Sequence, residues 1–386
     1  MCIRTAWSGA SVGLLLFIPL SGHCDLRVSG SEFGLNGVYK VKSVLRIKFF
    51  SVVVILSGCG QELDVERAVV PNVARAEIDE FVRRVIGRQV YVEGGKYLMG
   101  DFGAEYGAQK IQYDMDKNSK PLHEVELSSF SVSKFKVTNE EYQFYLKVTG
   151  APLPEADDGN VDYREFMLMR TQPALPAHVD WYEADKYCSW LKAVSGLPFS
   201  LPTEAQWEYV ARSRGQFLAV ATDDGTYKVT DELYNRDGSG GPQGINISTN
   251  RDRKEFAQSF GWKSRGLTSL PVDRFPPNPL GVYAMSDNGF EWVSDWYDPD
   301  YYSVSPVLNP EGPSAPVYKG RDTSDKYAKV MRGVDYANAQ WGGGYNVRRR
   351  YYTPDATKQS SWRERDLRVI ADKTARCVVN SHEPLN

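Results

Sequence analysis

The spacing of apolar and polar positions along the chain predicts short strands and helices joined by long loops. Residues 90–100 alternate around Gly94 and Gly95, which predicts a β-hairpin that turns on these two glycines. Residues 123–132 alternate with a period of two, which predicts a strand. The segments 329–336 and 348–352 precede a last strand, which is expected at residues 366–370. This strand is expected to close the fold.

Four helices are predicted. Residues 74–86 carry apolar side chains at helical spacing, which is typical of a short amphipathic helix that acts as a stalk or docks on a domain. The other three are expected at residues 137–146, 181–194 and 203–212. Thr138, Asp180 and Thr203 supply their N-terminal caps. Glu141 follows Thr138 by three residues, the spacing of a capping box.

Two long segments show neither the period of a strand nor that of a helix. Residues 213–262 and 298–328 are rich in Gly, Asp, Ser and Pro, so we expect loop with little regular structure there. The mixture of short strands, short helices and long loops predicts an α+β, loop-rich fold in a single domain.

The N-terminal part of the chain carries two apolar runs, at residues 13–20 and 49–56. Basic residues precede the second run, which is too short to span a bilayer, and Leu-Ser-Gly-Cys at residues 56–59 follows it. This arrangement resembles the signal of a bacterial lipoprotein, in which Cys59 becomes the lipid-modified first residue. A buried strand or a membrane anchor would explain the apolar run alone. Gly60 after the cysteine favours the outer membrane, so we expect a periplasmic protein that is lipid-anchored through Cys59.

These patterns divide the chain into segments. We interpret residues 1–42 as an over-extended reading of the gene, because a signal peptide begins at the N-terminus. The remaining segments are a lipoprotein signal peptide at 43–58, a tether with the short helix at 59–87, the domain at 88–371 and a C-terminal tail at 372–386.

The composition argues against nucleic-acid binding and against a zinc site. The net charge of −3 gives no basic surface for nucleic acid, so no nucleic-acid partner is expected. The five cysteines include no closely spaced pair, and the four histidines are scattered, which makes a zinc cluster a poor interpretation. Cys188 and Cys377 would be the only thiols left besides the lipid-modified one. In an oxidising compartment they could pair, and their separation neither supports nor excludes it.

Residues 281–297 combine aromatic side chains with acids between turn residues. Glu291, Trp292, Asp295 and Trp296 lie within this stretch. Buried acids next to indole rings need hydrogen-bond partners or a bound ion. We interpret these four residues as structural core.

Several motifs occur in the order found in the formylglycine-generating enzyme, or sulfatase-modifying factor, family. The motifs are Gly-Gly-Lys-Tyr-Leu-Met-Gly at 94–100, Val-Thr-Asn-Glu-Glu-Tyr at 137–142, Leu-Pro-Thr-Glu-Ala-Gln-Trp-Glu at 201–208, Asn-Gly-Phe-Glu-Trp-Val-Ser-Asp-Trp at 288–296, Met-Arg-Gly at 331–333 and Leu-Arg-Val at 367–369. The resemblance covers roughly residues 88–371. It implies one compact, loop-rich α+β domain, related to the C-type-lectin-like architecture.

The resemblance does not carry over the oxidase reaction. Oxidase members hold copper(I) with two cysteines, spaced Cys-x-x-x-x-Cys after an Arg-Gly-Gly-Ser motif, and oxidise a substrate cysteine to formylglycine. Here Val334 and Asp335 replace the Gly-Ser of that motif, and Asn338 and Gly343 stand where the thiols would be. Copper(I) needs soft thiolate ligands. We therefore expect no copper, no catalytic residue of the oxidase type and a non-catalytic member of the family.

The family also binds calcium, and calcium is a candidate cofactor through Asp287 and Glu291. The site is eroded in this chain, because Ala284 replaces the usual Asp or Asn and Asp287 replaces Gly. A second ligand cluster, around Asn246 and the segment before Pro271, is also weak.

Four arginines match or nearly match arginines of the family: Arg332, Arg348, Arg350 and Arg368. We interpret Arg332 and Arg368 as structural core, bridging loops and pairing with Asp295 or Glu291.

Loops after the Met-Arg-Gly motif are the expected site of function. The candidate partner-binding residues are Asp335, Tyr336, Asn338, Trp341, Tyr345 and Arg348. Lipoproteins of this family resemble immunity proteins that neutralise effector toxins of the type VI secretion system. A protein partner, most plausibly a secreted effector, is therefore expected. The alternatives are a periplasmic maturation enzyme of the siderophore-chromophore type and a regulatory or structural envelope lipoprotein.

Overall fold

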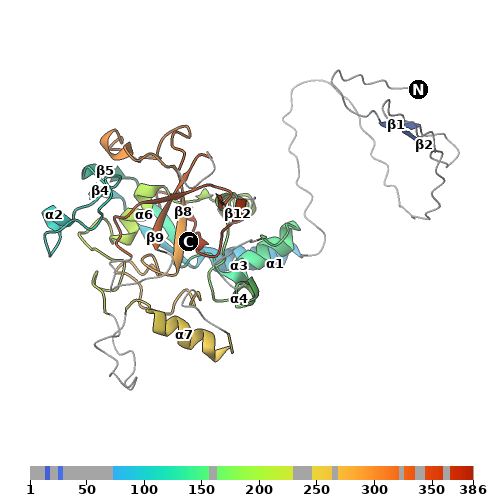
Figure 1. Ribbon diagram of the computed structural model, residues 1–386, viewed down its shortest axis with the longest axis horizontal. Coiled ribbons are helices and arrows are strands. Elements are labelled where there is room, and N and C mark those ends of the chain that lie inside the picture. The colour runs from blue at the N-terminus through green and yellow to red at the C-terminus, as the bar shows by residue number, and fades with distance from the viewer. Residues whose placement is uncertain are drawn as a thin grey trace. The chain divides into compact units, whose positions relative to one another are not determined.

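The computed structural model describes residues 14–17, 25–28, 73–155, 163–228, 246–262, 268–320, 326–334, 344–359 and 366–385 (Figure 1). The chain divides into two units, Met1–Glu66 and Arg67–Asn386. Within the first unit, β1 (Leu14–Phe17) and β2 (Asp25–Val28) form an antiparallel pair. The rest of the fold described below belongs to the second unit. The expected signal peptide and Cys59 lie outside the described residues.

One four-stranded sheet lies at the centre of the second unit, with strand order β10-β9-β8-β13 (Figure 1). Its strands are β8 (Gly289–Trp296), β9 (Lys329–Val334), β10 (Arg350–Tyr352) and β13 (Lys373–Thr374). The stretch with mixed aromatic and acidic residues forms β8, which pairs antiparallel with β9 and parallel with β13. The register of β8 and β9 shifts between Trp292 and Trp296.

A second four-stranded sheet has the order β3-β6-β14-β7, and two further antiparallel pairs join β4 to β5 and β11 to β12. The strands of the second sheet are β3 (Gln89–Val92), β6 (Phe130–Ser133), β7 (Phe199–Ser200) and β14 (Val378–Val379). The two pairs are made by β4 (Gly95–Met99), β5 (His123–Leu127), β11 (Thr357–Gln359) and β12 (Asp366–Arg368).

The prediction of a β-hairpin at residues 90–100 is wrong. Both strands exist, but β3 pairs with β6, whereas β4 pairs with β5. Gly94 marks a close crossing of two backbones, because a Cβ atom there would lie 2.2 Å from the carbonyl oxygen of Leu127. The single strand expected at residues 123–132 is likewise two strands, β5 and β6.

The helices are α1 (Arg75–Ile86), α2 (Gly103–Tyr106), α3 (Asn139–Thr149), α4 (Tyr163–Arg170), α5 (Trp181–Ser195), α6 (Glu204–Ala211), α7 (Asn250–Ser259) and the 3-10 turn η1 (Tyr301–Ser303). The three predicted caps are confirmed, since Thr138, Asp180 and Thr203 each form a capping box at the start of α3, α5 and α6. The amphipathic helix is also confirmed as α1.

The expectation of little regular structure at residues 213–262 is wrong for α7. Thr249 and Asp252 form a capping box at the start of this helix. Thr249 therefore provides a local signal that the surrounding polar composition obscured. The helix α4 was not predicted either.

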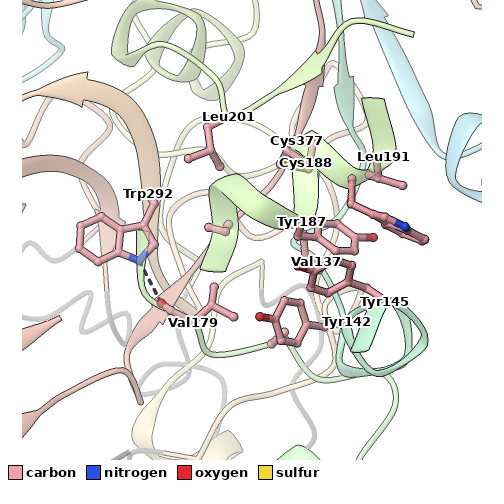
Figure 2. Packing of buried hydrophobic residues seen from close by; sticks show 14 of the residues in the cluster. Val137, Tyr142, Tyr145, Val179, Tyr187, Cys188, Leu191, Leu201, Trp292 and Cys377 are labelled. Carbon is pink, nitrogen blue, oxygen red and sulfur yellow. Dashed lines mark hydrogen bonds between the residues drawn. A yellow bond between two sulfur atoms is a disulfide. The ribbon is translucent and has the colours of Figure 1, made fainter. Parts of the chain in front are cut away.

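The core contains two large clusters of buried apolar side chains. Figure 2 shows part of the first, in which the rings of Tyr142, Tyr145 and Tyr187 gather beside the disulfide between Cys188 and Cys377. The helix α1 buries its apolar face in the same cluster, so it is part of the domain core. Ring stacking with a centroid separation of 4.4 Å joins Phe81 of α1 to Phe144 of α3.

Residues expected to form a C-terminal tail belong to the core. The strands β13 and β14 lie in the two four-stranded sheets, and Arg376 and Cys377 between them are buried. The α+β, loop-rich character expected from the sequence is confirmed. Within the described residues, no helix is both long and apolar enough to cross a membrane.

Candidate functional site

Two glutamates on one face of α6 organise a set of buried arginines. Glu204 and Glu208 are one helical turn apart and are nearly inaccessible to solvent. The guanidinium of Arg332, from β9, donates to Glu204 Oε1 and to Glu208 Oε2, each at 2.7 Å. Arg349 donates to both oxygens of Glu204, at 2.7 and 2.9 Å. Glu208 also accepts from Arg212 at 2.8 Å. We call these five residues the buried arginine network.

Charge complementarity maintains this network. Burial raises the pKa of Glu204, but Arg349 and Arg332 outweigh that effect and leave its pKa below the ordinary value. The same carboxylates raise the pKa of Arg332, although burial opposes them. These groups remain charged and paired, so they serve as a rigid platform and are not poised to transfer protons.

The expected pairing of the structural arginines with Asp295 or Glu291 is wrong. Arg332 pairs with the two glutamates of α6. Arg368 donates to Asp180 Oδ2 at 2.8 Å and lies 2.6 Å from Glu183 Oε1. It therefore links β12 to the N-terminal turn of α5, where acidic residues are favoured. The glutamates were missed because they are separated from Arg332 by 128 and 124 residues.

Asp295 is buried beside the network, and within the described residues no arginine forms an ion pair with it. Its Oδ2 accepts from the backbone N–H of Glu204 at 2.8 Å and from Ser294 Oγ at 3.0 Å. Burial and the neighbouring charge of Glu204 raise the pKa of Asp295 from 3.8 to about 7. This carboxyl group therefore titrates near neutral pH inside the core.

The two tryptophans of β8 have different surroundings. Trp292 is buried, and its indole N–H donates to the carbonyl of Val179 at 3.0 Å (Figure 2). Trp296 is half-buried and lies against the ammonium of Lys329, which is 3.9 Å from its ring centroid. The same ammonium is 4.1 Å from the ring centroid of Trp181. Burial lowers the pKa of Lys329 to about 8.

Both carboxylate oxygens of Glu291 accept hydrogen bonds from cationic groups or from an indole N–H. Its carboxylate accepts from Lys136 Nζ at 2.7 Å, from Arg376 at 2.5 and 2.8 Å, and from the indole of Trp207 at 3.1 Å. Burial raises its pKa, yet Arg376 and Lys136 lower it to about 2 overall. The structural role expected for Glu291 agrees with these contacts.

Asp287 and Glu291 do not fit a shared calcium site. Asp287 pairs with Arg253 and accepts from the backbone N–H groups of Ser248 at 3.2 Å and Asn288 at 2.7 Å. Calcium needs about six to eight oxygen ligands, and the carboxylate oxygens here are occupied by protein donors. Within the described residues no group of three or more His, Cys, Asp or Glu side chains is placed to hold a metal ion.

Cys188 of α5 and Cys377 form a disulfide, which the sequence left open. The bond joins positions separated by 189 residues, and both cysteines are almost wholly buried. It connects α5 to the segment just before β14 (Figure 2). Neither sulfur is therefore available as a thiolate nucleophile or metal ligand.

Six aromatic rings form a cluster that runs from buried Phe102 and Tyr113 to exposed Tyr106 and Phe217. They form a continuous run of neighbouring rings, which we call the aromatic ladder: Tyr106, Phe217, Phe102, Tyr113, Tyr345 and Tyr227. Tyr106 stacks on Phe217 with centroids 4.3 Å apart, and Tyr113 stacks on Tyr345 at 4.8 Å. The ladder combines three segments of the chain that are distant in sequence.

Two of the six predicted partner-binding residues belong to this region. Tyr345 is part of the ladder, and Arg348 lies 5.5 Å from the Tyr345 ring centroid and donates to the carbonyl of Tyr113 at 3.2 Å. The other four predicted residues, Asp335, Tyr336, Asn338 and Trp341, lie outside the described residues.

Sequence reasoning missed the other members of the ladder. Residues 101–122 and 217–227 show neither strand nor helix periodicity strong enough to assign a face. The available signal was the presence of Tyr106, Ile111, Tyr113 and Met115 in a short loop that is otherwise polar. Ile111 and Met115 are 55% and 84% exposed, which adds apolar surface beside the rings.

Comparisons with known proteins agree with this architecture. The family description "Sulfatase-modifying factor enzyme 1-like domain" matches residues 74–366. The serine/threonine-protein kinase pkn1 of Chlamydia caviae is 29% identical over 277 residues, with coverage of 68% of this chain and 37% of that protein. The formylglycine-generating enzyme of Streptomyces coelicolor is 29% identical over 284 residues, with coverage of 64% of this chain and 78% of that enzyme.

The solved structure of PvdO from Pseudomonas aeruginosa aligns with a TM-score of 0.48 and 23% identity, over 75% of this chain and 93% of that one. This chain spans little more than a third of the length of the chlamydial kinase, but most of the Streptomyces enzyme. The family match covers more than half of the chain and includes the residues of the buried arginine network and Cys188, whereas Cys377 lies beyond its end. The chain therefore belongs to the sulfatase-modifying factor enzyme 1-like, or formylglycine-generating enzyme, family.

Proposed function

We propose that this protein is a non-catalytic member of the family that binds a protein partner, and that it serves as an immunity protein against an effector of the type VI secretion system. The disulfide carries the proposal. Oxidase members need two free thiolates for copper(I), whereas Cys188 and Cys377 are the only cysteines after residue 59 and are bonded to each other. The oxidase reaction therefore has no thiol pair in this domain.

The aromatic ladder supports a binding role. Tyr106 and Phe217 are 46% and 43% exposed, although their rings are stacked on each other. Tyrosine, phenylalanine and arginine are enriched in protein interfaces, where rigid rings fill pockets of the partner at a small cost in conformational entropy. The ladder with Arg348 therefore offers an aromatic surface with a cation at its edge. The predicted residues Asp335, Tyr336, Asn338 and Trp341 precede Tyr345 in the sequence and remain candidates for partner binding.

A periplasmic location follows from the proposed lipid anchor at Cys59. The disulfide supports it, because such bonds form and persist in oxidising compartments such as the bacterial periplasm. A lipid-anchored binding protein in the periplasm would meet an incoming effector before that effector reached its target. Anchoring through Cys59 is therefore part of the proposed protective function.

A siderophore-type maturation enzyme is the second candidate, since its chemistry does not depend on the missing thiols. Asp295 would be its candidate acid, with a pKa of about 7, but this group is only 2% exposed. A regulatory or structural envelope lipoprotein is the third candidate. The exposed ladder favours binding over both enzyme and purely structural roles.

Competition between strains tests the proposal. A deletion strain is grown with an attacking strain that carries type VI secretion, and is complemented with wild type, with Cys59→Ala or with Phe217→Ser. We expect wild type to restore survival, and Cys59→Ala and Phe217→Ser to restore it poorly at equal protein levels. Phe260→Ser is the matched control, because Phe260 is 45% exposed and lies outside the ladder, after α7.

The outcomes separate the candidates. Unchanged survival of the deletion strain would contradict the immunity role. Loss of siderophore maturation in the same strain would instead support the enzyme. Equal protection by Phe217→Ser and wild type would show that the ladder is not the contact surface.

A further inference from the structure

The buried ammonium group of a lysine side chain is surrounded by three oxygens from β8 and β13. Lys136 lies between β6 and α3 and is fully buried. Its Nζ donates to the carbonyl of Gly289 at 2.8 Å, to Glu291 Oε1 at 2.7 Å and to Thr374 Oγ1 at 3.3 Å. An ammonium group has three N–H donors, so these three oxygens use all of them.

A buried guanidinium holds a second group of oxygens. Arg253 of α7 donates to the carbonyl of Thr268 at 2.7 Å and to Ser248 Oγ at 2.8 Å, and it pairs with Asp287. Asp287 Oδ2 also accepts from the backbone N–H of Ser248. The guanidinium thereby joins the start of α7, the segment before Pro271 and the turn before β8.

These positions coincide with the two places where the family resemblance implies calcium. The first is the stretch of Ala284, Asp287 and Glu291, and the second is the cluster around Asn246 and the segment before Pro271. Lys136 binds two oxygens of residues 289–291. Arg253 binds oxygens on both sides of the second cluster. We infer that Lys136 and Arg253 replace calcium with cations that belong to the chain, so that the domain folds without calcium.

Electrostatics explain why the replacement excludes the metal. The single carboxylate of Glu291 already faces two cations, Lys136 and Arg376. A divalent ion in this space would lie within a few ångströms of an ammonium, and like charges at that distance repel strongly in a buried environment. Lys136 would have to leave before calcium could enter.

The backbone at Ala284 suits a side chain that carries an oxygen. Its φ is 54°, in the left-handed region, which Asn and Asp adopt more readily than Ala. The resemblance places Asp or Asn at this position, where the side chain would supply an oxygen. Ala284→Asn therefore suits the backbone and restores an oxygen donor, while Lys136→Ala removes the competing cation.

Thermal unfolding of the full chain tests the inference, with excess calcium chloride or with EGTA. The wild-type midpoint is expected to be the same in both buffers, because a ligand raises stability only if it binds the folded state. Lys136→Ala is expected to unfold several degrees lower, while Lys134→Ala on the same loop stays near wild type. Lys136→Ala/Ala284→Asn is expected to unfold at a higher temperature in calcium than in EGTA.

Equilibrium dialysis of the wild type against calcium provides a measurement that does not depend on how well the variants fold. We expect no stoichiometric binding. Stoichiometric calcium binding, or a wild-type midpoint that falls in EGTA, would overturn the inference. A folded double variant that ignores calcium would overturn the assignment of Lys136 to the metal position.

Discussion

The buried arginine network and the aromatic ladder differ in how they use strongly interacting side chains. In the network, Arg332 and Arg349 are wholly enclosed, and short bonds to Glu204 and Glu208 fix their positions. In the ladder, Tyr106 and Phe217, whose rings are stacked on each other, are 46% and 43% exposed. Burial is complete for the charged groups of the network and incomplete for the outer rings of the ladder.

Arg212 connects the two regions. Its guanidinium donates to Glu208 in the network and lies 4.4 Å from the ring centroid of Phe102 and 5.7 Å from that of Phe217. A fixed cation under the rings restrains the base of the ladder while its outer rings stay exposed. The network therefore provides rigidity, whereas the ladder has exposed surface that is available for binding.

Breaking the network should produce the largest loss of stability. Arg332→Met removes the partner of Glu208 Oε2 and leaves a buried carboxylate without compensation at that oxygen. We expect a loss of about 3–5 kcal/mol in the free energy of unfolding, the range typical when one member of a buried ion pair is removed. Urea denaturation measures it. Arg350→Met is the control, because its exposed pair with Asp116 should contribute less than about 1 kcal/mol.

Similar losses for Arg332→Met and Arg350→Met would contradict the contrast between a buried network and the surface. They would indicate that water reaches Glu208 after the substitution and solvates its charge.

The network and the capping boxes show which features were accessible to sequence reasoning. The cap of α3 involves Thr138 and Glu141, which are three residues apart, so the pattern is visible without knowledge of the fold. The pairing of β3 and β4 is different, because alternation predicts a strand but does not identify its partner. The glycine pair between them was therefore misread as a turn.

Long-range partners determined most of the candidate site. The arginine of β9 was identified, but its glutamates on α6 were not, since charge pairing carries no distance signal in a single sequence. The aromatic ladder required three separate segments to meet. Only Tyr345 and Arg348 of this region are predicted from the sequence, because they lie in the loops that follow the Met-Arg-Gly motif.

The free energy of unfolding is expected to depend on pH through Asp295, at the edge of the network. Folded Asp295 has a pKa of about 7, above its ordinary value of 3.8, because burial and Glu204 disfavour its charge. Between these values the folded state holds a proton that the unfolded state has lost. The free energy of unfolding should therefore fall as pH rises from about 4 to about 7, by up to about 1.4 kcal/mol per pH unit from this group.

Asp295→Asn should remove this contribution while keeping an oxygen that accepts from Glu204 N–H. Relative to wild type, the variant should gain stability as pH rises through this range. Urea denaturation across the range measures both proteins. Parallel curves for wild type and variant would show that Asp295 does not titrate in the folded state as described.

The smallest loss of stability is expected at the outer rings of the ladder. Phe217→Ser removes an exposed ring and its stacking on Tyr106, so the loss should be below about 1.5 kcal/mol. Phe102→Ala, within the same ladder but fully buried, should lose about 3–5 kcal/mol through the cavity it leaves. Urea denaturation of the two variants compares them directly.

If Phe217→Ser lost as much stability as Phe102→Ala, the outer rings would belong to the folding core. The contrast between the ladder and the network would then be contradicted. A small loss at Phe217 combined with weak protection in the competition assay has the opposite meaning. The ring would then matter little to folding and greatly to the partner, which is the pattern expected of a side chain whose exposure is maintained for binding.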